Sequence, residues 1–357
     1  MDKLHFVRKT INEETIVRDE ELKFDSTQKY YKDITEALHI DDFPLICVNT
    51  IEKKTYMMQL SGGQCYLVFN HYLLECMHVL NQFVCGKEFS KPLESFFYKI
   101  VSEECYNCNR ILTAITFAGK YIEHIDEVIQ QYLEAPFLEQ IPDYLFVQQS
   151  FLIAHELFHF YLHRNPESYD KGLNSKTRYL KSIYEYVNNK HTEVAGFIEK
   201  AIKSPTMIEE CLCDSTALIQ AIDVGIKIGK LDVVESGISV AIALMNQYII
   251  STIQDTVKHV GEISYEGLQN LFNFRLQHIK MFTEQYIKKY YSKEESQIYQ
   301  EKVESIQGIW LNKVFTPVMY LLVDISPILK ESQVCNSKTH EEIKDAENVL
   351  KKIYNMY

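Results

Sequence analysis

Residues 151–163 of this 357-residue chain carry the side chains best suited to chemistry. The segment contains His155, Glu156 and His159 in the order His-Glu-x-x-His. On an α-helix, His155 and His159 lie one turn apart on the same face, so their imidazoles can bind one metal ion together. Glu156 lies beside them and can take a proton from a water molecule on that metal. The spacing therefore predicts a zinc site with Glu156 as general base.

The residues around this motif predict a buried helix. Apolar side chains surround the motif on almost every side, as they do in a helix that lies in a protein core. A charged glutamate between two histidines is costly there unless something pairs with it, and a metal-bound water provides that partner. The alternative interpretation is three polar residues on the surface of an amphipathic helix, and the neighbouring apolar residues do not suit a surface.

Zinc needs a third protein ligand, and the segment after residue 204 offers two candidates. Pro205 favours the first turn of a helix, and on such a helix Glu210 and Asp214 share a stripe with small residues. We expect Glu210 to bind the zinc and Asp214 to orient a ligand histidine through a hydrogen bond. Glu209 competes with Glu210 as the ligand. However, Thr206-x-x-Glu209 has the pattern of a capping box, which predicts a structural role for Glu209.

Other histidine and cysteine residues are weaker candidates for metal ligands. His163 continues the stripe of His155, but the helical rise between them is about 12 Å, which is too far for one zinc ion. Cys105 and Cys108 form a single pair without a second one nearby, whereas a structural zinc site needs four ligands. We therefore expect structural roles for these residues.

The motif formed by His155, Glu156 and His159, with Glu210 and Asp214 about fifty residues later, resembles that of the gluzincin zinc peptidases. The resemblance covers about residues 150–222. It implies a zincin-like catalytic core, one zinc ion per chain, and hydrolysis of peptide bonds in a protein or peptide substrate. The motif is also similar to that of bacterial cytosolic proteins such as Lit-type phage-exclusion peptidases and ImmA-like repressor-cleaving regulators.

The composition predicts a mainly helical α+β protein. Only 12 glycines and 8 prolines occur in 357 residues, about half the usual share and too few for a many-stranded sandwich or barrel. Residues 71–104 and 268–287 show helical spacing. Residues 43–70 contain short strand patterns around a glycine-rich turn, which predicts a β-hairpin. Residues 111–117 are a further strand candidate because they are rich in β-branched side chains.

We expect three parts along the chain. Residues 1–110 form an N-terminal α+β part with the hairpin, residues 111–230 form the zincin-like catalytic core, and residues 231–357 form a helical part without a catalytic constellation. A zinc peptidase also needs a tyrosine or histidine to stabilise the oxyanion, and the 24 tyrosines do not single one out. Its substrate-pairing edge strand is expected at residues 111–117 or 65–70.

Charge and cysteine content indicate the partners and the cellular compartment of the protein. The formal net charge of −12 argues against nucleic acid as a partner. Nine cysteines without a framework spacing indicate reduced thiols in the cytoplasm, and the N-terminus has no apolar signal core. The most apolar run, residues 237–253, carries Asn246 and Gln247, so we expect a buried helix there and no membrane span.

The sequence therefore predicts a soluble, cytoplasmic metallopeptidase with one zinc ion. One alternative is a non-catalytic or partner-gated sensor with a zinc-peptidase fold, for which a role in bacterial stress or phage defence follows by analogy only. The other alternative is a helical scaffold in which the motif occurs by chance and binds no zinc.

Overall fold

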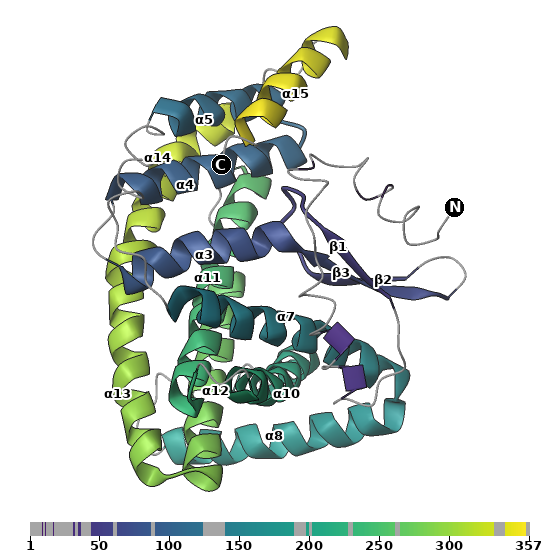
Figure 1. The fold of residues 1–357 in the computed structure, drawn as a ribbon, viewed down its shortest axis with the longest axis vertical. Coiled ribbons are helices and arrows are strands. Elements are labelled where there is room, and N and C mark those ends of the chain that lie inside the picture. The colour runs from purple at the N-terminus through teal and green to yellow at the C-terminus, as the bar shows by residue number, and fades with distance from the viewer. Residues whose placement is uncertain are drawn as a thin grey trace.

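The protein is mainly helical, with a small three-stranded sheet towards its N-terminal end (Figure 1). This confirms the expected fold class. The computed structural model describes residues 44–59, 63–86, 90–123, 140–188, 202–227, 231–260, 265–331 and 340–354, together with 9, 11, 17, 31–32, 35–36 and 198–199.

The sheet has the strand order β1-β3-β2. Its strands are β1 (Leu45–Val48), β2 (Tyr56–Gln59) and β3 (Cys65–Asn70). β2 and β3 pair antiparallel, which confirms the expected hairpin, and β1 pairs with β3 in parallel. Because β3 lies in the centre, both of its edges are already paired. The expectation that residues 65–70 pair with a substrate is therefore wrong, and among the described strands the edges belong to β1 and β2.

The strand expected at residues 111–117 is also wrong, because these residues begin helix α5 (Ile111–Glu123). Ala114, Phe117 and Tyr121 are buried at spacings of three and four residues, and α5 packs against α4 (Ser90–Asn107). Burial of one helical face has outweighed the β propensity of the branched side chains.

The remaining described helices form most of the molecule. They are α3 (His71–Cys85), α7 (Gln140–Arg164), α8 (Pro166–Asn188), α10 (Pro205–Lys227), α11 (Val233–Lys258), α12 (Tyr265–Tyr290), α13 (Lys293–Trp310), α14 (Thr316–Glu331) and α15 (His340–Tyr354). Helices α3, α4 and α12 confirm the helical spacing expected at the described residues of 71–104 and 268–287. A π-helical turn, η1 (Leu311–Phe315), joins α13 to α14.

Helix α11 runs through the middle of the molecule (Figure 1). It is buried along most of its length, and α3, α4, α7, α10, α12, α13 and α14 pack around it. Gly225 lets α10 approach α11 closely, because a Cβ atom there would lie 2.3 Å from Ser236 Oγ. One hydrophobic cluster contains residues from all three expected parts. The first and last parts also meet directly, because the Ser102 and Tyr354 hydroxyls lie 2.7 Å apart. The three-part division stays a prediction.

Two described helical stretches have the length and hydropathy that a membrane span requires. The first, Val233–Lys258, is α11, and 89% of its apolar window is buried inside the molecule. The second, Lys293–Glu331, comprises α13, η1 and α14, and 22% of its window is buried.

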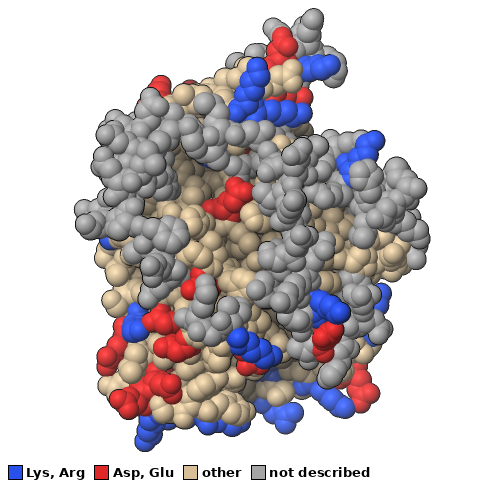
Figure 2. Space-filling model, in the orientation of Figure 1, with Lys and Arg blue, Asp and Glu red and all other residues tan. Residues whose placement is uncertain are grey.

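On the face shown in Figure 2, acidic and basic side chains lie intermingled over the described residues, and the uncharged surface is hollowed near its middle.

Candidate metal centre

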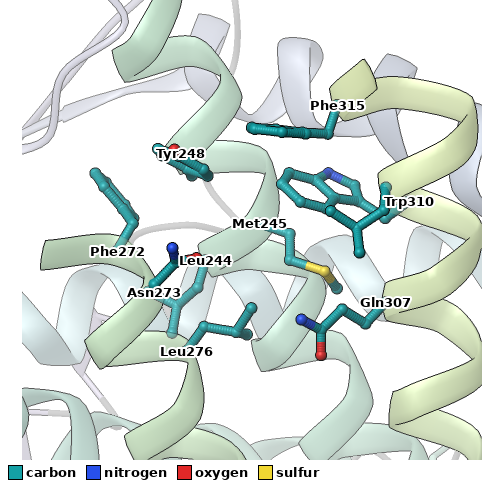
Figure 3. A pocket seen from close by; sticks show the side chains of 10 residues that line it. Leu244, Met245, Tyr248, Phe272, Asn273, Leu276, Gln307, Trp310 and Phe315 are labelled. Atoms are coloured by element: carbon teal, nitrogen blue, oxygen red, sulfur yellow. The ribbon is translucent and has the colours of Figure 1, made fainter. Parts of the chain in front are cut away.

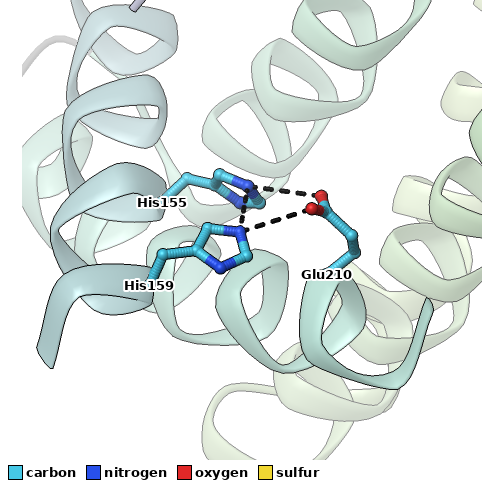
Figure 4. A group of neighbouring side chains, drawn as sticks. All are labelled: His155, His159 and Glu210. Carbon is cyan, nitrogen blue, oxygen red and sulfur yellow. Dashed lines mark hydrogen bonds and ion pairs between the residues drawn. The ribbon is translucent and has the colours of Figure 1, made fainter. Parts of the chain in front are cut away.

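Helices α7 and α10 pack side by side and bring His155, His159 and Glu210 together (Figure 4). The Nε2 atoms of His155 and His159 are 3.1 Å apart. Each of these nitrogens lies 3.4 Å from an oxygen of the Glu210 carboxylate. The donor atoms of a tetrahedral zinc site are about 3.3 Å apart. Two imidazoles and one carboxylate at these distances therefore fit a single zinc ion.

Carboxylates also lie against the opposite nitrogens of both imidazoles. His159 Nδ1 is 2.8 Å from Glu209 Oε1, at hydrogen-bond geometry. His155 Nδ1 is 2.9 Å from Asp214 Oδ1, in an ion-pair contact that is not aligned as a hydrogen bond. Protons on the two Nδ1 atoms leave lone pairs on the two Nε2 atoms. With both imidazoles neutral, these lone pairs face each other and the Glu210 carboxylate, and they repel unless a metal ion or a proton lies between them.

Arg275 of helix α12 contacts two of these carboxylates, Asp214 and Glu210. Its Nε and Nη2 donate to the two oxygens of Asp214 at 2.8 and 2.7 Å, and Nη1 lies 3.1 Å from Glu210 Oε2. Burial alone would raise the pKa of Asp214, but the neighbouring Arg275 and His155 hold that pKa at about 2. Asp214 is therefore a permanent anion at neutral pH.

The protonation of the histidine and glutamate ligands is tightly coupled. Burial opposes a charge on His155, but its contacts with Asp214 and Glu210 raise the pKa to about 9. Burial alone would also raise the pKa of Glu210, and its contacts with His155, His159 and Arg275 lower that pKa instead. Without a metal, the pocket therefore holds a positive charge on His155 beside an anionic Glu210. This is the charge pattern that a bound cation would replace.

Glu209 does not cap its helix as the sequence pattern predicted. Helix α10 begins at Pro205, and the backbone N–H of Met207 donates to Ser204 Oγ at 3.4 Å. The Glu209 carboxylate instead contacts His159 Nδ1, the Tyr169 hydroxyl at 3.0 Å and, also at 3.0 Å, Nε2 of His163. The capping-box interpretation is wrong because the helix begins at Pro205, two residues before the start that Thr206 as N-cap requires.

Glu156 lines a cavity of about 400 Å³ beside the candidate ligands. Burial raises the pKa of Glu156, and the nearby His155 and His159 oppose that rise. Tyr56, the first residue of β2, and Thr55 just before it line the same cavity. The sheet edge beside the site is therefore that of β2, and neither of the two strands expected from the sequence provides it.

The C-terminal third, expected to carry no catalytic constellation, also contributes to the site. Arg275 and four residues of α11 line the cavity: Gln247, Ile250, Ser251 and Gln254. Sequence reasoning missed them because no short motif links them to the histidines. Arg275 did leave one signal, since it lies beside Leu271 and Phe272 in an apolar helical stripe, where an arginine is seldom found without a partner.

A second cavity, of about 140 Å³, lies between α11, α12 and the end of α13 (Figure 3). Aromatic and aliphatic side chains form most of its wall, and its described lining includes no acid, histidine or cysteine. Phe272 belongs to this wall and also lies against Arg275, whose guanidinium carbon is 5.7 Å from the Phe272 ring centre. The groups suited to chemistry are therefore in the first cavity.

The cysteines do not form a metal site among the described residues. All eight described cysteines are free thiols, and none belongs to a cluster of potential metal ligands. Burial raises the pKa of the Cys105 and Cys108 thiols, so both are neutral near pH 7.

No family model, curated protein or solved structure matches this chain. The assignment of function therefore depends on the geometry of the site and on its chemistry.

Proposed function

We propose that this protein is a zinc-dependent peptidase that hydrolyses peptide bonds in a protein or peptide substrate. The observation that supports this proposal is the convergence of two imidazole nitrogens and one carboxylate beside a cavity that Glu156 also lines. His155, His159 and Glu210 would hold one zinc ion per chain. When bound, zinc would polarise the scissile carbonyl and lower the pKa of a water molecule.

Glu156 is the proposed general base. It takes a proton from the attacking water and passes it to the leaving amine. A general base works best when its pKa lies near the operating pH, and burial raises the pKa of Glu156 in that direction. Asp214 and Glu209 hold the two imidazoles from their Nδ1 sides, as carboxylates commonly do for histidine ligands of zinc.

The cavity also offers groups for the substrate. β2 is an edge strand whose first residue, Tyr56, lines the cavity, so an extended peptide can pair with its backbone. The Tyr56 side chain itself packs against the hydrophobic cluster that includes Tyr66 and Val68, so β2 offers its backbone rather than the Tyr56 hydroxyl to a substrate.

The test compares the wild type with Glu156→Gln, both purified without a histidine tag. About one zinc per chain is expected in both proteins. New N-termini should appear in a proteome treated with the wild type and not with the variant, because loss of a general base lowers the rate by about 10²–10⁴-fold. Zinc binding without cleavage by the wild type would favour the non-catalytic sensor. A protein without zinc would favour the chance motif.

A further inference from the structure

A stripe of polar side chains on helix α11 faces the candidate metal centre. Gln247, Ser251 and Gln254 lie at spacings of four and three residues, on one face of the helix, and line the cavity that His155 and Glu156 also line. At about 400 Å³, this cavity falls within the range of about 300–1,000 Å³ that is usual for ligand pockets. Polar groups in a protein core need partners, so a polar ligand suits this wall.

The polar side chains of this wall differ in their hydrogen bonds. Gln254 Nε2 donates to the Glu52 carbonyl oxygen and to Glu104 Oε2, each at 3.3 Å. Gln247 Oε1 is buried without a hydrogen-bond partner, and so is Thr55 Oγ1 from the segment before β2. Unpaired buried polar atoms destabilise a protein. Gln247 Oε1 is a buried acceptor without a donor, on a residue that lines the cavity.

Charges around the cavity disfavour an ionised side chain of either sign. Lys54 lines it, and together with a bound zinc ion it repels a lysine or arginine side chain, whereas the lining residues Lys53 and Arg275 are already paired with Glu103 and Asp214. Glu156 and Glu210 also line it and repel a carboxylate. Like-charge contacts of this kind select against wrong ligands. A neutral side chain with both a hydrogen-bond donor and an acceptor fits these walls.

We propose that this cavity receives the side-chain amide of a glutamine or asparagine residue next to the scissile bond, with Gln247 as the contact that determines specificity. Two amides can pair through two hydrogen bonds, donor to acceptor in each direction. A substrate amide therefore meets Gln247 in either orientation of the Gln247 amide. This inference rests on the proposed function, because the metal centre determines where the scissile bond lies.

The test measures binding rather than turnover. Amino-acid hydroxamates bind zinc through their hydroxamate group and can carry glutamine, methionine, glutamate, lysine or glycine side chains. Two series place the side chain on the amino or the carboxyl side of that group. Isothermal titration of the zinc-loaded full-length protein should show, in one series, that the glutamine derivative binds about tenfold more tightly than the methionine derivative, which lacks the amide hydrogen bonds. It should also bind more tightly than both charged derivatives.

Two variants provide the matched comparison. Gln247→Met should reduce the advantage of the glutamine derivative over the methionine derivative to within twofold. Gln220→Met changes a half-buried glutamine on α10 outside the lining of the cavity and should leave that advantage unchanged. The glycine derivative should bind all three proteins equally, which also shows that the variants are folded and loaded with zinc.

The possible outcomes separate this inference from the proposed function. If the methionine, glutamate or lysine derivative binds as tightly as the glutamine derivative in both series, the amide assignment is overturned. An unchanged glutamine preference in Gln247→Met overturns the role of Gln247. If no derivative binds, including glycine, the metal centre is overturned and the amide pocket with it. The expected ranking in a protein that cleaves no peptide supports the pocket and contradicts the proposed hydrolysis.

Discussion

Three carboxylates of one helix meet different atoms of the histidine pair. Glu210 faces both Nε2 atoms, whereas Glu209 and Asp214 face the two Nδ1 atoms. Consecutive helical residues point about 100° apart, so Glu209 and Glu210 can contact different sides of His159. Only Glu210 is placed to share a metal ion with both imidazoles, and the effects of substituting these carboxylates should differ accordingly.

We predict that Glu210→Ala loses zinc almost completely, because it removes a donor atom and a negative charge from the site. Glu209→Ala should weaken zinc binding about 10–100-fold, since His159 keeps its donor but loses the partner that orients it. Glu209→Gln, which can still accept a hydrogen bond, should weaken binding less than Glu209→Ala. Competition with a chelator measures all three variants. Stronger zinc binding by Glu210→Ala than by Glu209→Ala would contradict the ligand assignment.

Zinc binding should depend on pH through His155. In the metal-free protein the pKa of His155 is raised to about 9, so below that pH zinc must displace a proton. Apparent zinc affinity should rise about tenfold per pH unit up to pH 9 and level off above it. Asp214→Asn removes the anion that contributes to the raised pKa and should flatten this dependence. The measurement is chelator competition between pH 6.5 and 10, corrected for protonation of the chelator; the prediction fails if the wild type shows no slope below pH 9.

Arg275 should matter first for stability. It pairs with Asp214 in the buried interior, and removal of one partner of a buried pair costs about 3–5 kcal/mol because it leaves the other charge unpaired. Arg275→Met should therefore lower Tm strongly. Asp214→Asn in the Arg275→Met background should restore part of that stability. Thermal unfolding of the single and double variants tests this, and a double variant less stable than Arg275→Met would show that the two side chains act independently.

At the scale of elements, the sequence predicted those features that depend on one helix alone. The helical period places His155 and His159 on one face without knowledge of any neighbour. It could not predict which side of α10 meets α7. The capping-box interpretation of Glu209 failed because α10 begins at Pro205, before the position that the box requires. Residues 111–117 have strand propensity and still form a helix because α4 covers one of their faces. Arg275 joins the site only through the packing of α12 on α10.

The contact of helix α8 with α10 contains a buried lysine. Lys176 Nζ donates to Ser215 Oγ at 2.6 Å and lies over the rings of Tyr179 and Phe282. Burial lowers the pKa of Lys176 to about 8, below its value in the unfolded chain, so folding favours the neutral amine. The stability of the wild type should therefore increase as the pH rises from about 8 to about 10.5, and a charged Lys176 should destabilise the protein at lower pH.

We predict that Lys176→Met stabilises the protein at pH 7 by on the order of 2–3 kcal/mol. The variant should also lose the increase in stability between pH 8 and 10.5. Denaturant unfolding across this pH range measures both effects. Lys171→Met provides the control, since Lys171 pairs on the surface with Glu167, where ion pairs contribute little. A destabilised Lys176→Met would mean that its hydrogen bond to Ser215 outweighs the burial of the charge.

At the scale of the molecule, the candidate site depends on parts that are distant in sequence. The histidines lie on α7, whereas Arg275 and the polar wall of the cavity come from α12 and α11. A chain that ends at residue 230 lacks both of these helices and leaves the faces of α7 and α10 that they cover exposed. We predict that a fragment of residues 1–230 neither folds stably nor binds zinc. Circular dichroism and zinc analysis of the fragment test this, and a folded fragment with bound zinc would show that the core is autonomous.

The aromatic cavity in Figure 3 includes the single tryptophan of the chain in its wall. All indole fluorescence of the protein therefore comes from Trp310, which lies 5.3 Å from the Phe315 ring and 6.2 Å from the Tyr248 ring. Phe272 joins this wall to Arg275, and Arg275 contacts Glu210. Metal loading that moves Arg275 would change the environment of Trp310, so a shift in the emission of this buried indole reports zinc uptake without an added label.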